Sequence, residues 1–455
     1  MEEAAPYGQG WTRDQADGGD VRCADNQQLR LQNPDLLADI EANAFWTDEI
    51  AADLAPRLFV DRITVPTFVA GAWQDEQTGG QFTGLWEGAF ESAPITRYTG
   101  YNGVHADGYT PDILIEWHNF LSFYVRGEIP EIPPLVRTLA PLLFESYFGA
   151  ALEIPPDRFL MSGSFDQALA SYEAEEDVRI LFEAGAHPDE DPGLPRSSWE
   201  IHLPSWPAPG LTPRRWYFSP KGLLVDTPPD PDGGSADYVF NPALAKTTSL
   251  PSGDVNKSLP PYQWAHDAPG EAAVFISDPL AEDTVMVGPG SVDLWIRSTA
   301  TEADLEVNLS EVRPDGKEIY VQSGWLRASH RGLAPESTEL RPIHTHLAED
   351  AAPLVPGEWI QARVELFPFA HAFRAGSSIR LAIDTPGGSR PSWTFIVADV
   401  PDGTIHTVGH DEAHPSSVVL PVLPGSEIKT PLPPCPSLRG QPCRDYVEYT
   451  NTISP

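Results

Sequence analysis

A change in hydrophobic pattern at about residue 178 constrains the fold of this chain more than any other feature of its sequence. Downstream of that point, apolar and polar residues alternate with a period of two, as in the stretches 292–297, 303–310 and 379–384. The chain also has 48 prolines and 36 glycines, which separate such stretches with turn signals. The pattern predicts that residues 178–455 form an antiparallel β-sandwich in which each sheet keeps one polar face in water.

An α/β pattern precedes the sandwich. Residues 63–71 predict a buried strand, residues 79–91 a helix, and residues 95–100 a second strand. Thr110-Pro111-Asp112 then predicts a helix start, because proline suits the first turn and aspartate complements the helix dipole. A strand, a crossover helix and a second strand form a right-handed parallel unit. Two strands are too few for a sheet, so we expect this unit to be the edge of a larger one.

The other segments predict helices or loops. Residues 1–22 are polar without periodicity, whereas residues 34–54 have apolar side chains at helical spacing. Residues 134–148 and 166–175 also predict helices. We therefore expect three parts: a polar terminus with a helical segment over residues 1–60, the α/β part with a helical extension over 61–177, and the β-sandwich over 178–455.

The charge of the chain excludes several kinds of partner. With 29 basic and 66 acidic residues, its formal net charge is −37. Such a chain repels phosphate backbones and anionic lipid, so we expect no nucleic-acid partner and no membrane-surface role. No apolar stretch approaches the roughly 20 residues that span a bilayer.

The three cysteines leave the compartment open. A disulfide between Cys435 and Cys443 would close a short loop and indicate export, because cytosolic thiols stay reduced. The alternative is that all three cysteines, Cys23 included, are reduced thiols. The first residues lack the basic and apolar regions of a signal peptide, so an extracellular location would require a longer N-terminus.

Asp75 and His105 are the candidate catalytic pair. Each follows a predicted parallel strand, and open α/β sheets place their sites beyond the carboxyl ends of such strands. The acid and the histidine of an α/β-hydrolase triad occur in this order. The acid orients the imidazole, which takes the proton of the nucleophile and later gives it to the leaving group. The alternative is structural: Asp75 caps the segment near Gly79, and His105 is an ordinary loop residue.

The nucleophile of such a triad is missing. The G-x-S-x-G motif that carries it in α/β-hydrolases does not occur in the 455 residues. Ser235 and Ser389 each follow two glycines, but both come after the histidine and lie in or near the β-rich part. That order is wrong for this fold, and Cys23 has no predicted strand before it.

Several segments resemble the cocaine esterase and X-prolyl dipeptidyl-peptidase family of α/β-hydrolases. Ile63-Thr64-Val65-Pro66, followed by Gly71-Ala72-Trp73-Gln74-Asp75, is similar to the acid-bearing strand of that family, with Ala72 inserted in its G-W-x-D pattern. Residues 102–108 resemble its histidine loop, and residues 119–125 resemble the helix that follows. Residues 214–224 and 414–421 resemble parts of its C-terminal jelly-roll, so the resemblance covers roughly residues 55 to 425.

This resemblance implies the C-terminal remnant of an α/β-hydrolase domain followed by a jelly-roll β-sandwich. It implies a serine hydrolase that cleaves a small acyl ester, or a peptide bond after an X-Pro dipeptide, without a cofactor. Asp75 would orient His105, and His105 would act as general base and acid. It also implies a helical cap that residues 20–60 would finish, and a nucleophile-bearing half upstream of Met1, where this sequence departs from the family.

Two side-chain patterns and one rival function stay open. His344 with His346, or His406, His410 and His414, could suggest a metal site, although structural or surface roles are the commoner explanation. Four tryptophans could line a carbohydrate-binding face or belong to the core: Trp295, Trp325, Trp359 and Trp393. The rival function is a non-catalytic one, either an acidic β-sandwich binding module or a degenerate hydrolase that kept its scaffold.

Overall fold

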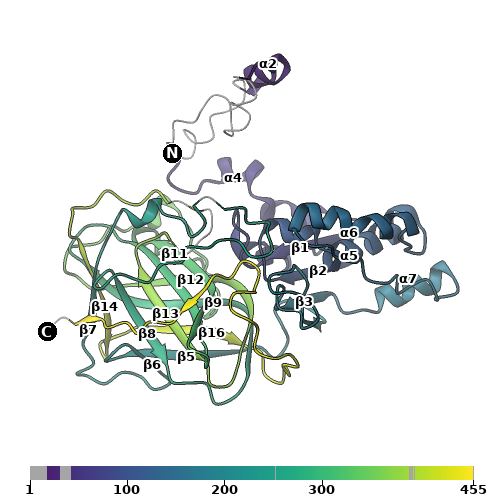
Figure 1. Ribbon diagram of the computed structural model, residues 1–455. Helices are drawn as coiled ribbons and strands as arrows, with labels where there is room; N and C mark the ends of the chain where they lie inside the picture. Colours follow the sequence, from purple (N-terminus) through teal and green to yellow (C-terminus); the bar gives the residue numbers. More distant parts are fainter. Residues whose placement is uncertain (1–17, 31–41, 252, 389–392, 394, 454–455) are drawn as a thin grey trace. The chain divides into compact units, whose positions relative to one another are not determined.

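The computed structural model describes residues 18–30, 42–251, 253–388, 393 and 395–453 (Figure 1). The chain divides into two compact units, residues 1–54 with 346–349 and residues 55–345 with 350–455. The first unit contains helices α2 (Val21–Arg30) and α4 (Asp48–Leu54). The side chain of Asp20 caps α2 by accepting the backbone N–H of Cys23 at 2.9 Å. The helix expected over residues 34–54 is only partly present: α4 forms its end, residues 43–47 are not helical, and residues 34–41 lie outside the described residues.

The second unit contains a four-stranded mixed sheet. Its strand order is β1 (Thr67–Ala72), β2 (Thr96–Tyr101), β3 (Val178–Phe182) and β4 (Trp199–Leu203). β2 is parallel to both β1 and β3, whereas β4 is antiparallel to β3. The parallel pairing of the first two predicted strands is therefore confirmed.

The start of the sandwich differs from the boundary expected at residue 178. β3 and β4 belong to the sheet of β1 and β2, and the first strand of the sandwich is β5 (Thr212–Ser219). β3 is a nearly continuous apolar run that is buried on both faces, which is typical of a parallel strand inside an α/β sheet. Its sequence therefore fits the parallel sheet better than the alternating sandwich.

Helices lie beside this sheet, as Figure 1 shows for α5 (Pro111–Leu121), α6 (Pro134–Phe148) and α7 (Phe165–Glu173). α5 begins with proline in its first turn, as expected. Ile113 of α5 packs against Ala72, Tyr101 and Leu181 at the ends of the three parallel strands. The helix expected over residues 79–91 is instead a 3₁₀ segment, η3 (Gly79–Leu85), because three glycines within it disfavour an α-helix.

The β-sandwich contains the remaining strands. They are β5, β6 (Leu223–Val225), β7 (Ser235–Val239), β8 (Ala272–Ser277), β9 (Thr284–Ser298), β10 (Asp304–Val312), β11 (Lys317–Arg327), β12 (Ile360–Phe373), β13 (Ser378–Asp384), β14 (Ile405–Asp411), β15 (His414–Pro415), β16 (Ser417–Val422), β17 (Cys443–Asp445) and β18 (Thr452–Ile453). The hydrogen-bonded order runs β17-β11-β10-β13-β8-β6-β5-β16-β9-β14-β7-β18, and β12 pairs with β9. β9 and β11 stand near opposite ends of this order. Because β12 pairs with β9 and also packs on β11, the sheet folds over on itself around one apolar core.

The polar face of β10 and β13 is buried, so the expected solvent-facing side is wrong for these strands. Every residue of β13, and every residue of β10 except Val312, is buried. The Glu318 carboxylate accepts from Ser310 at 2.8 Å and pairs with Arg380 at 3.1 Å and Arg444 at 2.8 Å. Polar groups that satisfy one another in this way can leave water, which an alternating pattern alone does not reveal.

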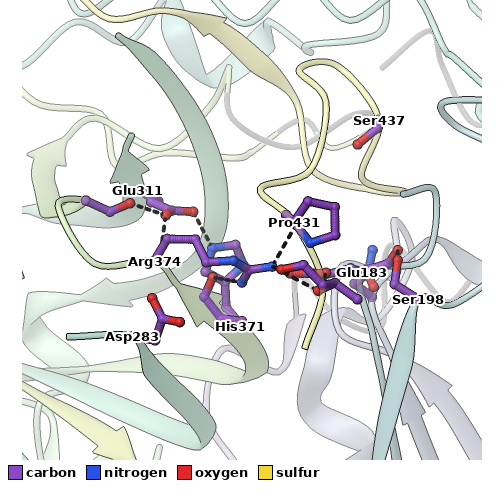
Figure 2. A network of polar contacts seen from close by, with 12 residues as sticks. Glu183, Ser198, Asp283, Glu311, His371, Arg374, Pro431 and Ser437 are labelled. Atoms are coloured by element: carbon purple, nitrogen blue, oxygen red, sulfur yellow. Dashed lines mark hydrogen bonds and ion pairs between the residues drawn. The ribbon is translucent and has the colours of Figure 1, made fainter. Parts of the chain in front are cut away.

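The four-stranded sheet and the sandwich are joined by a buried polar network, shown in Figure 2. Arg374, just after β12, donates to Glu183 at 2.6 Å, and Glu183 directly follows β3. His371 of β12 lies 2.9 Å from Glu311 of β10. Burial opposes ionisation of Glu311, but hydrogen bonds from His371 and Ser377 outweigh it and hold its pKa below the usual value. The network thus fixes the end of β3 against the sandwich.

His406 is a buried histidine of the sandwich core. Its ring lies 5.2 Å from the ring of Tyr238 and 5.5 Å from that of Phe240, and burial lowers its pKa from 6.5 to about 4. Between pH 6.5 and about pH 4, His406 is therefore mostly protonated in the unfolded chain and mostly neutral in the folded chain. The contribution of the neutral His406 to the free energy of unfolding is fully present above pH 6.5 and is lost as the pH falls toward 4.

We therefore expect His406→Leu to lose less stability than the parent chain when the pH falls. Between neutral pH and about pH 5 the difference should be about 1–2 kcal/mol, since one pKa unit corresponds to about 1.4 kcal/mol. Urea denaturation at the two pH values measures it. Equal losses of the free energy of unfolding in the two proteins would contradict the assignment.

Candidate active site

The parallel register of β1 and β2 brings Asp75 and His105 together. Ala72, the last residue of β1, pairs with Tyr101, the last residue of β2. Asp75 and His105 follow these strand ends by three and four residues, and His105 Nδ1 lies 2.8 Å from Asp75 Oδ2. The two residues that the sequence singled out are thus in direct contact at the carboxyl edge of the parallel strands.

Asp75 is held by the turn that follows it. Its Oδ1 accepts the backbone N–H groups of Gln77 and Thr78, each at 2.8 Å, and its side chain is only 10% exposed. One carboxylate oxygen therefore caps the turn before η3, while the other contacts the imidazole. The structural alternative for Asp75 and the pairing with His105 hold at the same time.

A buried aromatic cluster supports the strand end before Asp75. Trp73 has no solvent exposure, and its ring stacks on Phe82 at 5.3 Å and on Trp206 at 6.2 Å. The same ring lies against the backbone of β2 at Gly100, where a Cβ atom would come within 2.3 Å of it. Glycine at this position allows the close approach, and the packing fixes the chain two residues before Asp75.

His105 begins the short 3₁₀ segment η4 (His105–Tyr109). Its backbone N–H donates to Glu76 Oε2 at 2.8 Å, and its side chain is 56% exposed. Because a carboxylate only accepts, the contact with Asp75 favours the proton on Nδ1 and leaves a lone pair on Nε2. The imidazole is therefore oriented on one side and accessible on the other, as a general base requires.

A cavity of about 420 Å³ adjoins the pair. Its lining includes Asp75, His105 and Tyr101, and its apolar part includes Phe68, Phe82, Ile113 and Trp117. Burial raises the pKa of Tyr101, and the carboxylates of Asp107 and Asp75 raise it further. The Tyr101 hydroxyl therefore stays protonated in this mostly apolar cavity.

Three residues of the site were missed from the sequence: Glu76, Tyr101 and Arg439. Tyr101 is the last residue of β2, and Glu76 follows Asp75 in the turn after β1. Their positions at or just after the ends of predicted strands could have indicated both residues. Arg439 forms an ion pair with Asp107 in the histidine loop at 2.5 Å. No local pattern could have indicated Arg439, because 332 residues separate it from Asp107.

Of the remaining candidates that the structure describes, Trp393 donates to the carbonyl of Glu76 beside the site, whereas Ser235, Trp325 and Trp359 belong to the sandwich. Ser235 lies on β7 of the sandwich, paired with Gly409, and Ser389 lies outside the described residues. In the described ranges, no group of three or more histidine, cysteine, aspartate or glutamate side chains is arranged to hold a metal ion. Trp359 stacks on His414 at 4.3 Å, and Trp325 packs on Phe395 at 5.4 Å. Likewise, none of the described helices is both long and apolar enough to cross a membrane.

The structure decides between a disulfide and reduced thiols for Cys435 and Cys443. Cys435 and Cys443 form a disulfide, and their Cα atoms are 5.9 Å apart. The bond closes the loop that carries Arg439.

Comparisons with known proteins agree with this arrangement. Residues 171–419, more than half of the chain, match the family model of the X-Pro dipeptidyl-peptidase C-terminal non-catalytic domain. A protein of Mycobacterium bovis named "Putative serine esterase" is 29% identical over 226 residues, which are 48% of this chain and 35% of that protein. The chain thus spans about a third of the length of the curated relatives that it matches.

Solved structures share the fold at lower identity. A CocE/NonD family hydrolase from Staphylococcus aureus is 15% identical with a TM-score of 0.59, and the match covers 88% of this chain and 62% of that one. An α-amino acid ester hydrolase is also 15% identical, with a TM-score of 0.54 and the same coverage. These likenesses show that the α/β part and the β-sandwich occur together in known hydrolase structures.

The geometry predicts the effect of Asp75→Asn. An asparagine keeps an oxygen for the amides of Gln77 and Thr78 but can present its NH₂ group to His105, so the imidazole proton should move from Nδ1 to Nε2. Two-bond ¹H–¹⁵N correlation spectra of the histidine rings at alkaline pH report the tautomer. The melting temperature should change little, whereas Asp75→Ala, which also loses the cap, should lower it. An unchanged His105 tautomer in Asp75→Asn would contradict the observed pairing.

Proposed function

The chain belongs to the family of the X-Pro dipeptidyl-peptidase C-terminal domain, and on that premise we propose that it is the acid- and histidine-bearing part of a serine hydrolase. The observation that carries the proposal is the 2.8 Å contact between His105 Nδ1 and Asp75 Oδ2 at the ends of adjacent parallel strands. The attacking serine belongs to a polypeptide segment that this sequence does not contain.

The proposed reaction is acyl transfer to water. As the serine oxygen attacks the acyl carbon, His105 Nε2 takes its proton, and Asp75 stabilises the resulting imidazolium through Nδ1. The imidazolium then gives the proton to the leaving oxygen or nitrogen, which departs as an alcohol or an amine. Water next attacks the acyl-enzyme, with Nε2 again accepting the proton, and the acid is released as the serine is regenerated.

The substrate that we propose is a small acyl ester or a peptide bond, such as the bond after an X-Pro dipeptide. The mostly apolar cavity beside His105 suits an acyl group. The similar proteins named serine esterase and α-amino acid ester hydrolase support ester cleavage in this fold, and the name of the matching domain supports peptide cleavage.

The free edge of β1 supports the need for a complementary segment. Among the described strands, β1 pairs with β2 alone. Its sequence, Thr-Phe-Val-Ala-Gly-Ala, has no charge, proline or bulge of the kind that protects a natural sheet edge. A strand that paired with this edge in parallel would end next to Asp75, which is where the nucleophile of the proposed triad has to come from.

A non-catalytic role is the second candidate. It is favoured by the missing G-x-S-x-G motif and by the description of the matching domain as non-catalytic. In that case the Asp75–His105 contact is a retained part of a hydrolase scaffold. Activity measured with and without the complementary half separates the two candidates.

The chain alone should be catalytically silent. It should not react stoichiometrically with a fluorophosphonate probe, nor hydrolyse p-nitrophenyl acetate above the rate of free imidazole, because the described residues that line the cavity beside His105 include no serine or cysteine. Labelling of purified 1–455 followed by mass spectrometry tests this. Stoichiometric modification of one serine in this chain would overturn the claim that the nucleophile lies elsewhere.

Activity should appear when a complementary half that carries the serine is fused to the chain or co-expressed with it. His105→Ala should then lower kcat on the order of 10³-fold or more, because it removes the general base. Asp75→Asn should also slow turnover severely. His344→Ala and His414→Ala, which alter sandwich histidines, should stay within a few-fold of the parent, with melting temperatures measured for all variants.

Two outcomes would reject the proposal. One is near-normal turnover in His105→Ala while a sandwich histidine proves indispensable. The other is a completed protein that folds but hydrolyses neither esters nor X-Pro peptides, which would establish the non-catalytic candidate.

A further inference from the structure

The disulfide-closed loop at residues 435–443 is rooted in the sandwich. Cys443 belongs to β17, which pairs with β11 through Ile319. Gln441 donates from Nε2 to the carbonyl of Tyr320 at 2.8 Å, again on β11. With the Cys435–Cys443 bond closing its base, the loop is fixed at its root and has little freedom to move.

The loop presents one buried cation, Arg439, to the histidine loop. The side chain of Arg439 is 1% exposed and that of Asp107 is 2% exposed. Arg439 Nη2 lies 2.5 Å from Asp107 Oδ1, and Nε lies 3.1 Å from both carboxylate oxygens. The remaining guanidinium nitrogen donates to the carbonyl of Lys257. Such a fork-like contact fixes the orientation of the carboxylate as well as its position.

Asp107 passes this constraint to the residue before His105. Its Oδ2 accepts the backbone N–H of Val104 at 2.9 Å. The same oxygen lies so close to Gly103 that a Cβ atom there would come within 2.4 Å of it, and Gly103 has a φ of +148°. The carboxylate therefore sits directly against the backbone that leads into His105.

Two further hydrogen bonds hold the same segment, one to the backbone of Arg439 and one to the side chain of Gln74. Asn102 Nδ2 donates to the carbonyl of Arg439 at 3.2 Å, and Gly103 N–H donates to Gln74 Oε1 at 3.1 Å. Gln74 precedes Asp75, so the histidine loop and the acid-bearing turn are tied to each other and to the disulfide loop. The ring of His105 is 56% exposed, and the residue is held by the ring contact with Asp75 and the backbone contact with Glu76.

We propose that Arg439 is a positioning residue for His105, acting through Asp107 and held in place by the Cys435–Cys443 disulfide. The proposal rests on the proposed function, because it concerns how the general base of that reaction is aimed. If this role holds, the position of His105 depends on the disulfide between two cysteines that lie more than 300 residues downstream of it.

The physical reason is the cost of an unpaired buried charge. Without the guanidinium, Asp107 would keep a buried carboxylate with no cation beside it, and it would turn toward water or admit water. Either response removes the acceptor of the Val104 N–H group and lets the start of η4 shift. A shift of the order of 1 Å is enough to misalign an imidazole that depends on one hydrogen bond to Asp75.

The test measures the His105 tautomer in the full chain, 1–455. Two-bond ¹H–¹⁵N spectra at alkaline pH should show the Nδ1–H form in the parent and an increased share of the Nε2–H form in Arg439→Met. Arg439→Lys, which keeps the charge but not the fork, should restore the Nδ1–H share in part. Cys435→Ser combined with Cys443→Ser should move the spectrum in the same direction as Arg439→Met.

Arg215→Met is the matched control. It breaks the ion pairs of Arg215 with Asp293, whose side chain is 7% exposed, and with Glu339, and all three residues belong to the part of the chain that forms the sandwich. We expect it to lower the melting temperature about as much as Arg439→Met does and to leave the His105 tautomer unchanged. A general loosening of the fold would affect both variants alike.

Each outcome decides the proposal. An unchanged His105 spectrum in folded Arg439→Met, or an equal change in Arg215→Met, would overturn it. If Arg439→Met does not fold, Arg439→Lys and the double cysteine variant decide by the same criterion. The spectra need no serine, so an inactive completed enzyme would reject the proposed function while the spectra still judged the positioning role. In an active enzyme, Arg439→Lys should lower kcat more than it raises KM, and an unchanged kcat would also overturn the role.

Discussion

The site depends on the parallel alignment of two short strands. Because β1 and β2 end in register at Ala72 and Tyr101, the loops that follow them meet at one edge of the sheet. A shift of one residue in this pairing would turn the side chains of one strand to its other face and separate the acid from the imidazole. Trp73 resists such a shift, since its buried ring fits against Gly100 on the neighbouring strand.

The sandwich contributes to the site although none of its strands supplies the acid or the base. Gln74, next to the acid, donates to the carbonyl of Val321 on β11 at 2.9 Å. Arg374 ties the end of β3 to β12. The chain has a net charge of −37, and two of its buried arginines each pair with a carboxylate of the α/β part: Arg374 with Glu183, and Arg439 with Asp107. The sandwich therefore contacts both the acid-bearing turn and the end of β3.

Local pattern was sufficient to predict the main elements of the site. An apolar run followed by Asp75, and a second strand followed by His105, gave the parallel pair, and Pro111 gave the start of α5. The same reasoning predicted an α-helix at residues 79–91, where the glycines of η3 prevent one. The prediction followed the helical spacing of the apolar side chains, whereas in the fold the low helix propensity of the glycines decides the local structure.

What the sequence did not reveal depends on contacts between distant residues. The apolar run of β3 fits a parallel strand, but it was grouped with the strands that follow it, and its pairing with β2 is what assigns it to the α/β sheet. The alternation in β10 predicts solvent-facing polar residues, but Ser310 donates to Glu318 of β11, which also pairs with Arg380 and Arg444. Arg439 and Asp107 are far apart in the chain, so no spacing rule connects them.

The most direct test of this account is the crystal structure of the chain completed by its complementary half and inhibited with a phosphonate. The account predicts that the phosphonylated serine belongs to the complementary half, that its Oγ lies within about 3 Å of His105 Nε2, and that Nδ1 still contacts Asp75. A phosphonylated residue beside another histidine, or His105 facing away from every nucleophile, would contradict it.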